Sequence, residues 1–165
     1  MILGLSVAAF TKLHVAICLV AILSGLVTLL AMIGNRNLRA GTALFLITTV
    51  LTSVTGYFFH STSFGPPHVV GAISLVALAV AIWARYVRRM AGVWRPAYVI
   101  SATAALYLNC FVAVVQAFQK IPALNALAPN GKEPPFLVAQ GVLLLAAILL
   151  GFMAVRSFHP KPAVA

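Results

Sequence analysis

Long apolar runs, separated by short polar or Gly/Pro-rich breaks, dominate the chain. Five of these runs are 20 to 22 residues long: Leu13–Ile33, Ala40–His60, His68–Val87, Ala97–Phe118 and Pro135–Val155. A helix needs about 20 residues to cross about 30 Å of hydrocarbon. The runs are continuously apolar, whereas barrel strands alternate in segments of about ten residues. The pattern therefore predicts an all-α integral membrane protein, with five transmembrane helices in a single domain over residues 1–165.

The breaks between the runs contain residues that end or begin helices. Gly34 and Asn35 follow the first run, Pro66 and Pro67 precede the third, and Pro96 precedes the fourth. Glycine favours the C-terminal end of a helix, and proline favours its first turn. The first run is also longer than the apolar region of about 7–15 residues in a signal peptide, so we expect it to be a retained span.

Composition excludes a water-soluble protein. Apolar residues make up 63% of the chain and charged residues only 7%, against about 45–50% and about 25% in soluble domains. A net charge of +10 suggests nucleic-acid binding, but the cations occur in short clusters between apolar runs. We therefore expect the lipid bilayer, and no nucleic acid, as the partner of this chain, and a multi-pass location in a bacterial cytoplasmic (inner) membrane.

The positions of lysine and arginine predict the orientation, because cytoplasmic loops carry the excess of these residues. Three lysines lie on one side of the predicted bundle: Lys12, Lys120 and Lys132. Eight cations lie on the other: Arg36, Arg39, Arg85, Arg88, Arg89, Arg95, Arg156 and Lys161. This imbalance predicts an outer N-terminus and a cytoplasmic C-terminus. The cluster from Arg85 to Arg95, with aromatic residues beside it, is typical of contact with anionic lipid headgroups.

Hydroxyl residues form two stripes on the second predicted helix. Helical spacing aligns Thr49, Ser53, Gly56 and His60 on one stripe and Thr48, Thr52 and Thr55 on the other. In lipid, such residues turn toward other helices and form interhelical hydrogen bonds. We expect both stripes to face the interior of the bundle.

Three of the four histidines lie near the predicted outer face. His14 begins the first span, His60 ends the second and His68 begins the third, while the only acid, Glu133, directly precedes the fifth. The polar side chains of Tyr57, Gln116 and Gln140 have similar depths. Because ionisable residues are rare in spans and usually functional, these residues predict a binding site near the outer face.

Three kinds of ligand fit such a site. His14 and His68 on neighbouring helices would ligate a b-type haem from its two faces. Alternatively, His14, His60 and His68 would hold copper or zinc, with water, Cys18 or Glu133 as a fourth ligand. An isoprenoid quinone would instead take hydrogen bonds from Tyr57, His60, His68, Gln116 or Gln140. The lead hypothesis is a redox or quinone-linked membrane protein, and the sequence does not decide whether it is an enzyme.

A protein without a cofactor is the main alternative. In an accessory or scaffold subunit, the polar stripes would join helices, and small residues would pack against other membrane subunits or a second copy. Those small residues are Gly25, Ala77, Ala81 and Ala84. A small-solute transporter is less favoured, because no Asp or Glu lies inside any span and ion-coupled transporters usually place carboxylates there.

Overall fold

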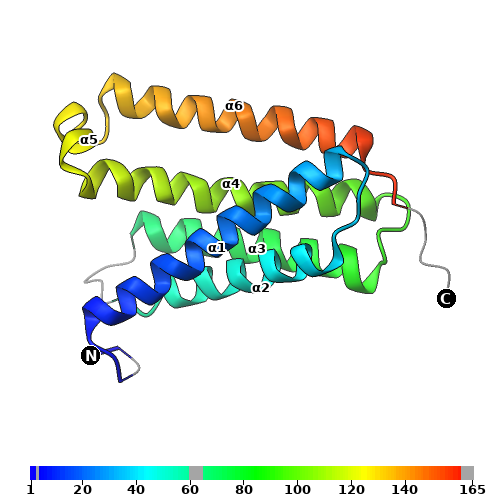
Figure 1. The fold of residues 1–165 in the computed structure, drawn as a ribbon, viewed down its shortest axis with the longest axis horizontal. Helices are drawn as coiled ribbons and strands as arrows, with labels where there is room; N and C mark the ends of the chain where they lie inside the picture. The colour runs from blue at the N-terminus through cyan, green and yellow to red at the C-terminus, as the bar shows by residue number, and fades with distance from the viewer. Residues whose placement is uncertain (3, 60–64, 161–165) are drawn as a thin grey trace.

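The computed structural model describes residues 1–2, 4–59 and 65–160. Apart from an isolated β-bridge between Ile2 and Leu5, the regular structure of these residues is helical (Figure 1). The elements are α1 (Val7–Ile33), α2 (Arg39–Gly56), α3 (Pro66–Ile82), the π-helix η1 (Trp83–Val87), α4 (Trp94–Lys120), α5 (Pro122–Leu127) and α6 (Pro134–Ser157).

Four segments of the described chain are long and apolar enough to cross a membrane: α1, α3 continued by η1, α4 and α6. The prediction of an all-helical protein with membrane-spanning helices is thus confirmed for four of the five predicted spans, by their length and apolar composition. The fifth predicted span corresponds to α2, which has only 18 residues and includes six Thr and Ser. The hydroxyl groups lower its mean hydropathy, so its apolar character alone does not identify it as a span.

Several helix boundaries differ from the predicted runs for local reasons. α1 begins six residues before Leu13, at Val7, because the side chain of Ser6 accepts a hydrogen bond from the Ala9 amide and caps the first turn. α4 begins before Pro96, since a proline in the first turn removes an N–H that has no partner within the helix. The short helix α5 lies in a connection where no helix is predicted.

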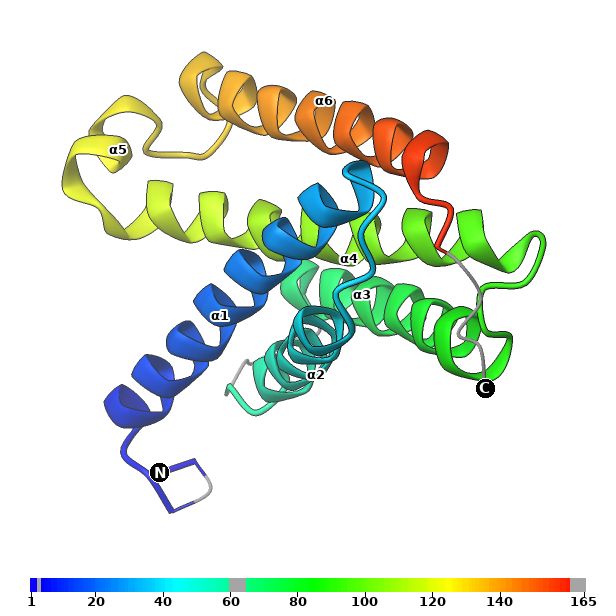
Figure 2. The ribbon, with the colours of Figure 1, turned by 45° about the vertical axis from the view of Figure 1, so that its right-hand side comes forward.

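α4 is the central helix of the bundle and packs against α1, α2, α3 and α6. α1 crosses it obliquely, packs along α2, and also contacts α6 near its own C-terminal end (Figures 1 and 2). A Cβ atom on Gly25 would lie 2.7 Å from the ring of Phe45 and 2.8 Å from Leu106. The absence of a side chain at Gly25 therefore lets α1, α2 and α4 approach one another closely.

The surface of α2 is arranged for a nonpolar environment. Its outward residues are Leu44, Ile47, Leu51 and Val54, which are 40–60% exposed, whereas its buried residues include Thr42, Thr48, Thr49, Thr52 and Ser53. Ser53 bonds to Ser74 of α3 at 3.1 Å, and Thr49 accepts a bond from Asn109 of α4 at 3.4 Å. As expected from the two stripes, the hydroxyl groups face neighbouring helices.

All seven arginines of the chain lie at one end of the bundle, which we call the arginine-rich end. Contacts between distant segments close this end: Arg95 donates to the Phe158 carbonyl at 2.9 Å, and the His159 amide donates to Asn35 at 2.8 Å. His14, His68 and Glu133 lie at the opposite end, which we call the histidine end. The two predicted groups of cations thus lie at the two ends of this bundle, with Lys161 outside the described residues.

Candidate functional site at the histidine end

His14 is held between the starting turns of α1 and the last turn of α2. Its Nδ1 atom lies 2.8 Å from the Oγ1 atom of Thr55, and its ring packs edge-on against Phe59 at 5.2 Å. His14 is therefore a half-buried histidine that joins α1 to the end of α2.

The hydrogen bonds of Thr55 determine which nitrogen of His14 carries the proton. The single hydroxyl proton of Thr55 is donated to the Leu51 carbonyl at 2.6 Å. Its oxygen must therefore accept the hydrogen bond from Nδ1–H of His14. In the neutral ring, Nε2 then carries the lone pair, the form in which imidazole accepts a proton or binds a metal.

His68 has a different environment. Its Nδ1 atom accepts a hydrogen bond from the Gly65 amide at 3.1 Å, which closes the first turn of α3. Tyr57 donates its hydroxyl to the His68 carbonyl at 2.7 Å, and the two rings lie 5.7 Å apart. Gly71 lies beside them, and a Cβ atom there would make a tight contact of 3.1 Å with the Tyr57 ring. The lone pair of Nδ1 in His68 is thus used to stabilise α3.

The structure places His14 and His68 against the end of α2 but gives them different partners. His14 contacts Thr55, while His68 contacts Tyr57. Two residues that are two positions apart in a helix point to nearly opposite sides. In the described part of the chain, no three His, Cys, Asp or Glu side chains gather within reach of one metal ion. His60 lies outside the described residues. Haem and metal ligation by these histidines stay predictions.

The two predicted glutamines have separate positions. Gln116 is exposed on α4. Gln140, on α6, donates to the Phe111 carbonyl of α4 at 3.2 Å, and its buried Oε1 atom has no hydrogen-bond partner in the structure. Gln140 therefore joins α6 to α4.

Glu133, suggested above as a metal ligand, instead closes the turn before α6. Its carboxylate accepts hydrogen bonds from the Lys132 amide at 2.9 Å and from both nitrogens of Asn130 at 2.8 and 3.1 Å. These bonds favour the ionised form, the Lys132 amide most strongly, and lower the pKa of Glu133 to about 2. The only acid of the chain therefore has a local structural role.

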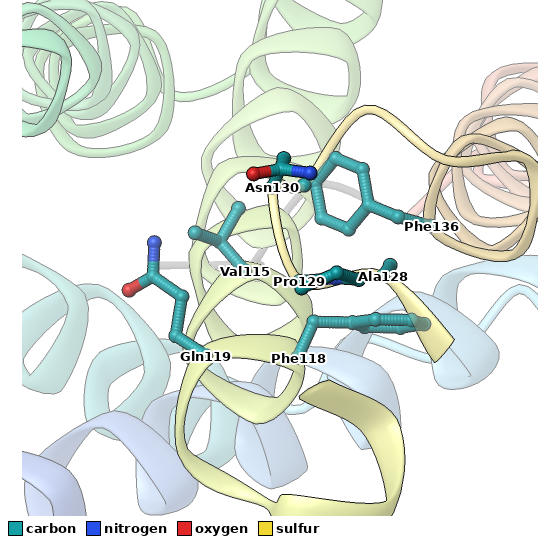
Figure 3. A pocket seen from close by; sticks show the side chains of 8 residues that line it. Val115, Phe118, Gln119, Ala128, Pro129, Asn130 and Phe136 are labelled. Atoms are coloured by element: carbon teal, nitrogen blue, oxygen red, sulfur yellow. The ribbon is translucent and has the colours of Figure 1, made fainter. Parts of the chain in front are cut away.

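A cavity of about 200 Å³ lies between the end of α4 and the turn before α6 (Figure 3). The rings of Phe118 and Phe136 meet edge-on across it at 5.4 Å, and Asn130 and Gln119 are at its rim. Of the residues predicted to form the site, none lines this cavity. It is a small opening beside the acidic turn.

Two residues of importance were not predicted as single positions from the sequence. Thr55 was assigned only to a hydroxyl stripe, although its bond to Leu51 determines the proton position on His14. The sequence places Arg85 in a cluster expected to contact lipid headgroups, but its side chain is only 7% exposed. Thr55 could not be singled out from the sequence, because the packing register between α1 and α2 decides which residue of α2 lies opposite His14.

Comparisons of the chain with protein-family models, with curated proteins and with solved structures find no match.

Proposed function

We propose that this protein binds a lipid-soluble redox ligand of the isoprenoid quinone class at its histidine end. The observation that carries the proposal is the 2.8 Å contact between Nδ1 of His14 and the Thr55 hydroxyl, from which we infer the proton position. With Nδ1–H donated to Thr55, the Nε2 atom accepts a hydrogen bond from the ring hydroxyl of a quinol. A partly buried imidazole at the end of a bundle of apolar helices is placed where an amphiphile presents its polar head.

A second observation supports a ligand near His14. Thr52 lies one turn inward of Thr55 on the same face of α2, and its buried Oγ1 atom has no hydrogen-bond partner in the structure. Buried polar atoms of native proteins nearly always have a partner in the protein, in water or in a ligand. A polar head group or its bound water would supply that partner.

The proposal includes five spans in a bacterial cytoplasmic membrane, with the histidine end outside. Two features support α2 as the fifth span: its outward residues are apolar, and at about 1.5 Å per residue its 18 residues extend about 27 Å. The seven arginines at the other end support a cytoplasmic location for that end.

The test is binding of a short-chain quinol, decylubiquinol, to the protein purified in mild detergent. We expect saturable binding, and we expect His14→Ala to weaken it by about tenfold or more, as for a lost hydrogen bond to a buried group. His159→Ala is the matched control, because this histidine lies at the arginine-rich end. Equal affinity in all three proteins would overturn the proposal.

The same preparation tests the haem and metal predictions. Absorption spectra before and after dithionite reduction would show a haem, and elemental analysis would show copper or zinc. A stoichiometric haem lost in His14→Ala would assign the Nε2 atom of His14 to iron and would replace the quinol proposal.

A second candidate is a membrane subunit without a cofactor, and the uncovered surface of α6 favours it. Only Ala154 of this 24-residue helix is buried. Of the four small residues expected to meet a partner, Ala81 and Ala84 are fully buried and Gly25 packs within the chain, whereas Ala77 is half-buried. Stoichiometric copurification of another membrane protein, with no quinol, haem or metal bound, would favour this candidate.

A further inference from the structure

An apolar groove of about 300 Å³ runs along α2 near the arginine-rich end. It is lined by Ala43, Leu46, Ile47 and Val50 of α2, Ile82 of α3 and Tyr86 of η1. From Ala43 to Val50, α2 advances by about 10 Å. The groove therefore follows the helix axis, which is the direction that lipid chains take beside a membrane-spanning helix.

Two exposed arginines follow the groove residues closely in sequence, and neither has an acidic residue at this end of the bundle. Arg39 is one turn before Ala43 on the same face of α2 and is exposed, and Arg89 is three residues after Tyr86. The only acid of the chain is Glu133, at the histidine end. The positive charge beside the groove is therefore complementary to an anion from outside the chain.

The π-helix determines which side chains reach the groove. Ala84 and Arg85 of η1 are buried, whereas Trp83 and Tyr86 are more than half exposed. Left-handed backbone at Arg89 and Met90 (φ 50° and 57°) then returns Met90 to Arg85, where the distance from Nη1 to sulfur is 3.8 Å. Aromatic residues are thus directed outward at the depth where membrane proteins meet lipid headgroups.

We propose that this groove is a binding site for an anionic phospholipid. One acyl chain lies along α2 between Ala43 and Val50, and the phosphate is bound by Arg39 and Arg89. The site differs from the quinone-class site in position and in chemistry, since it lies at the opposite end of the bundle and requires a negative charge.

The experiment is lipid titration of the purified full chain in a neutral detergent, followed by native mass spectrometry. Dioleoyl phosphatidylglycerol is compared with dioleoyl phosphatidylcholine, which has the same acyl chains and no net charge. We expect one phosphatidylglycerol to bind at least tenfold more tightly. Glycerol phosphate, which lacks the acyl chains, should not compete at equal concentration.

Variants separate the two parts of the site. Arg39→Gln with Arg89→Gln should weaken phosphatidylglycerol binding by about 25-fold, or about fivefold for each arginine near the surface. Ala43→Phe should fill the groove and weaken binding without a change in charge. If Ala43→Phe does not fold, Ile47→Trp is used instead, because it fills the groove from a more exposed position.

Arg156→Gln is the matched control for charge. Arg156 is at the same end of the bundle, but it is on α6, which lies across α4 from α2, and it packs on the ring of Phe152 (Figure 2). We expect its affinity for phosphatidylglycerol to be unchanged within twofold. Equal binding of the two lipids, competition by glycerol phosphate, or an equal loss in Arg156→Gln would overturn the proposal.

Discussion

The guanidinium carbon of Arg85 lies 5.1 Å from the centre of the Tyr98 ring, and both side chains are buried. The guanidinium group of Arg85 also donates a hydrogen bond, from Nη2 to the side-chain oxygen of Asn37, at 2.9 Å. A buried arginine is thus stabilised by a ring and an amide without a carboxylate. Burial of an ion is costly unless it is compensated, so these two contacts are expected to contribute strongly to the closure of the arginine-rich end.

We predict that Asn37→Ala destabilises the protein by about 1.5–3 kcal/mol, the usual contribution of a hydrogen bond to a charged group. In an Arg85→Met background the same substitution should have little effect, because the charge that needs the amide oxygen is gone. Thermal unfolding of the four proteins of this double-mutant cycle in one detergent measures the coupling. A similar loss in both backgrounds would show that Asn37 acts independently of Arg85.

Close packing at Gly25 leads to a second prediction. Gly25→Ala introduces a methyl group 2.7 Å from the Phe45 ring, and we expect a loss of about 1–3 kcal/mol from overpacking. Gly141→Ala is the control, since a Cβ atom there meets nothing within 4 Å, and alanine favours a helix over glycine. The midpoint of thermal unfolding should fall for Gly25→Ala and stay equal or rise for Gly141→Ala.

Apolar periodicity predicted the helical membrane fold because the requirement to cross a bilayer acts on each segment separately. Four predicted spans match helices that meet this requirement: α1, α3 continued by η1, α4 and α6. α2 is different: its hydroxyl groups are buried against three neighbours, so its average hydropathy hides an apolar outward face. The direction of each side chain depends on helix packing, which average hydropathy does not include.

The candidate site was predictable in its depth but not in its contacts. Sequence positions placed His14 and His68 at one end, as the structure has them. The choice of partner depends on tertiary geometry: Thr55 for His14, and the Gly65 amide for His68. The burial of Arg85 was missed for a related reason, because the π-helix changes the direction of residues that regular α-helical spacing would place elsewhere.

Thr55 offers a direct test of the proton position on His14. Thr55→Val keeps the shape of the side chain but removes the acceptor of Nδ1–H, so the ring is free to place its proton on Nε2. We expect decylubiquinol binding to weaken by about fivefold, which corresponds to about 1 kcal/mol for one hydrogen bond. Thr11→Val is the control, because the Thr11 hydroxyl bonds only to the Val7 carbonyl of its own helix. If Thr11→Val shows the same loss, the tautomer argument fails.

The turn before α6 should respond to acid. The folded-state pKa of Glu133 is lowered from 4.5 to about 2, so the stabilisation from its carboxylate is complete above pH 4.5 and is lost as the pH falls toward 2. We expect hydrogen exchange at the Asn130 and Lys132 amides to lose protection over this range, relative to amides within α6. Glu133→Gln should remove this pH dependence. Protection that stays constant down to pH 2 would contradict a role for the carboxylate.

The orientation of the bundle determines which compartment the histidine end faces, and cysteine labelling tests it. In a chain with Cys18 and Cys110 replaced by alanine, we expect Lys132→Cys to react with an impermeant maleimide added to intact cells. Arg89→Cys should react only after permeabilisation, because seven arginines at one end favour retention on the cytoplasmic side. The reverse pattern would place His14 at the cytoplasmic face and the lipid groove at the outer face. The bonds of His14 to Thr55 and of Arg85 to Asn37 would be unchanged, but the quinone-class ligand would then exchange protons with the cytoplasm.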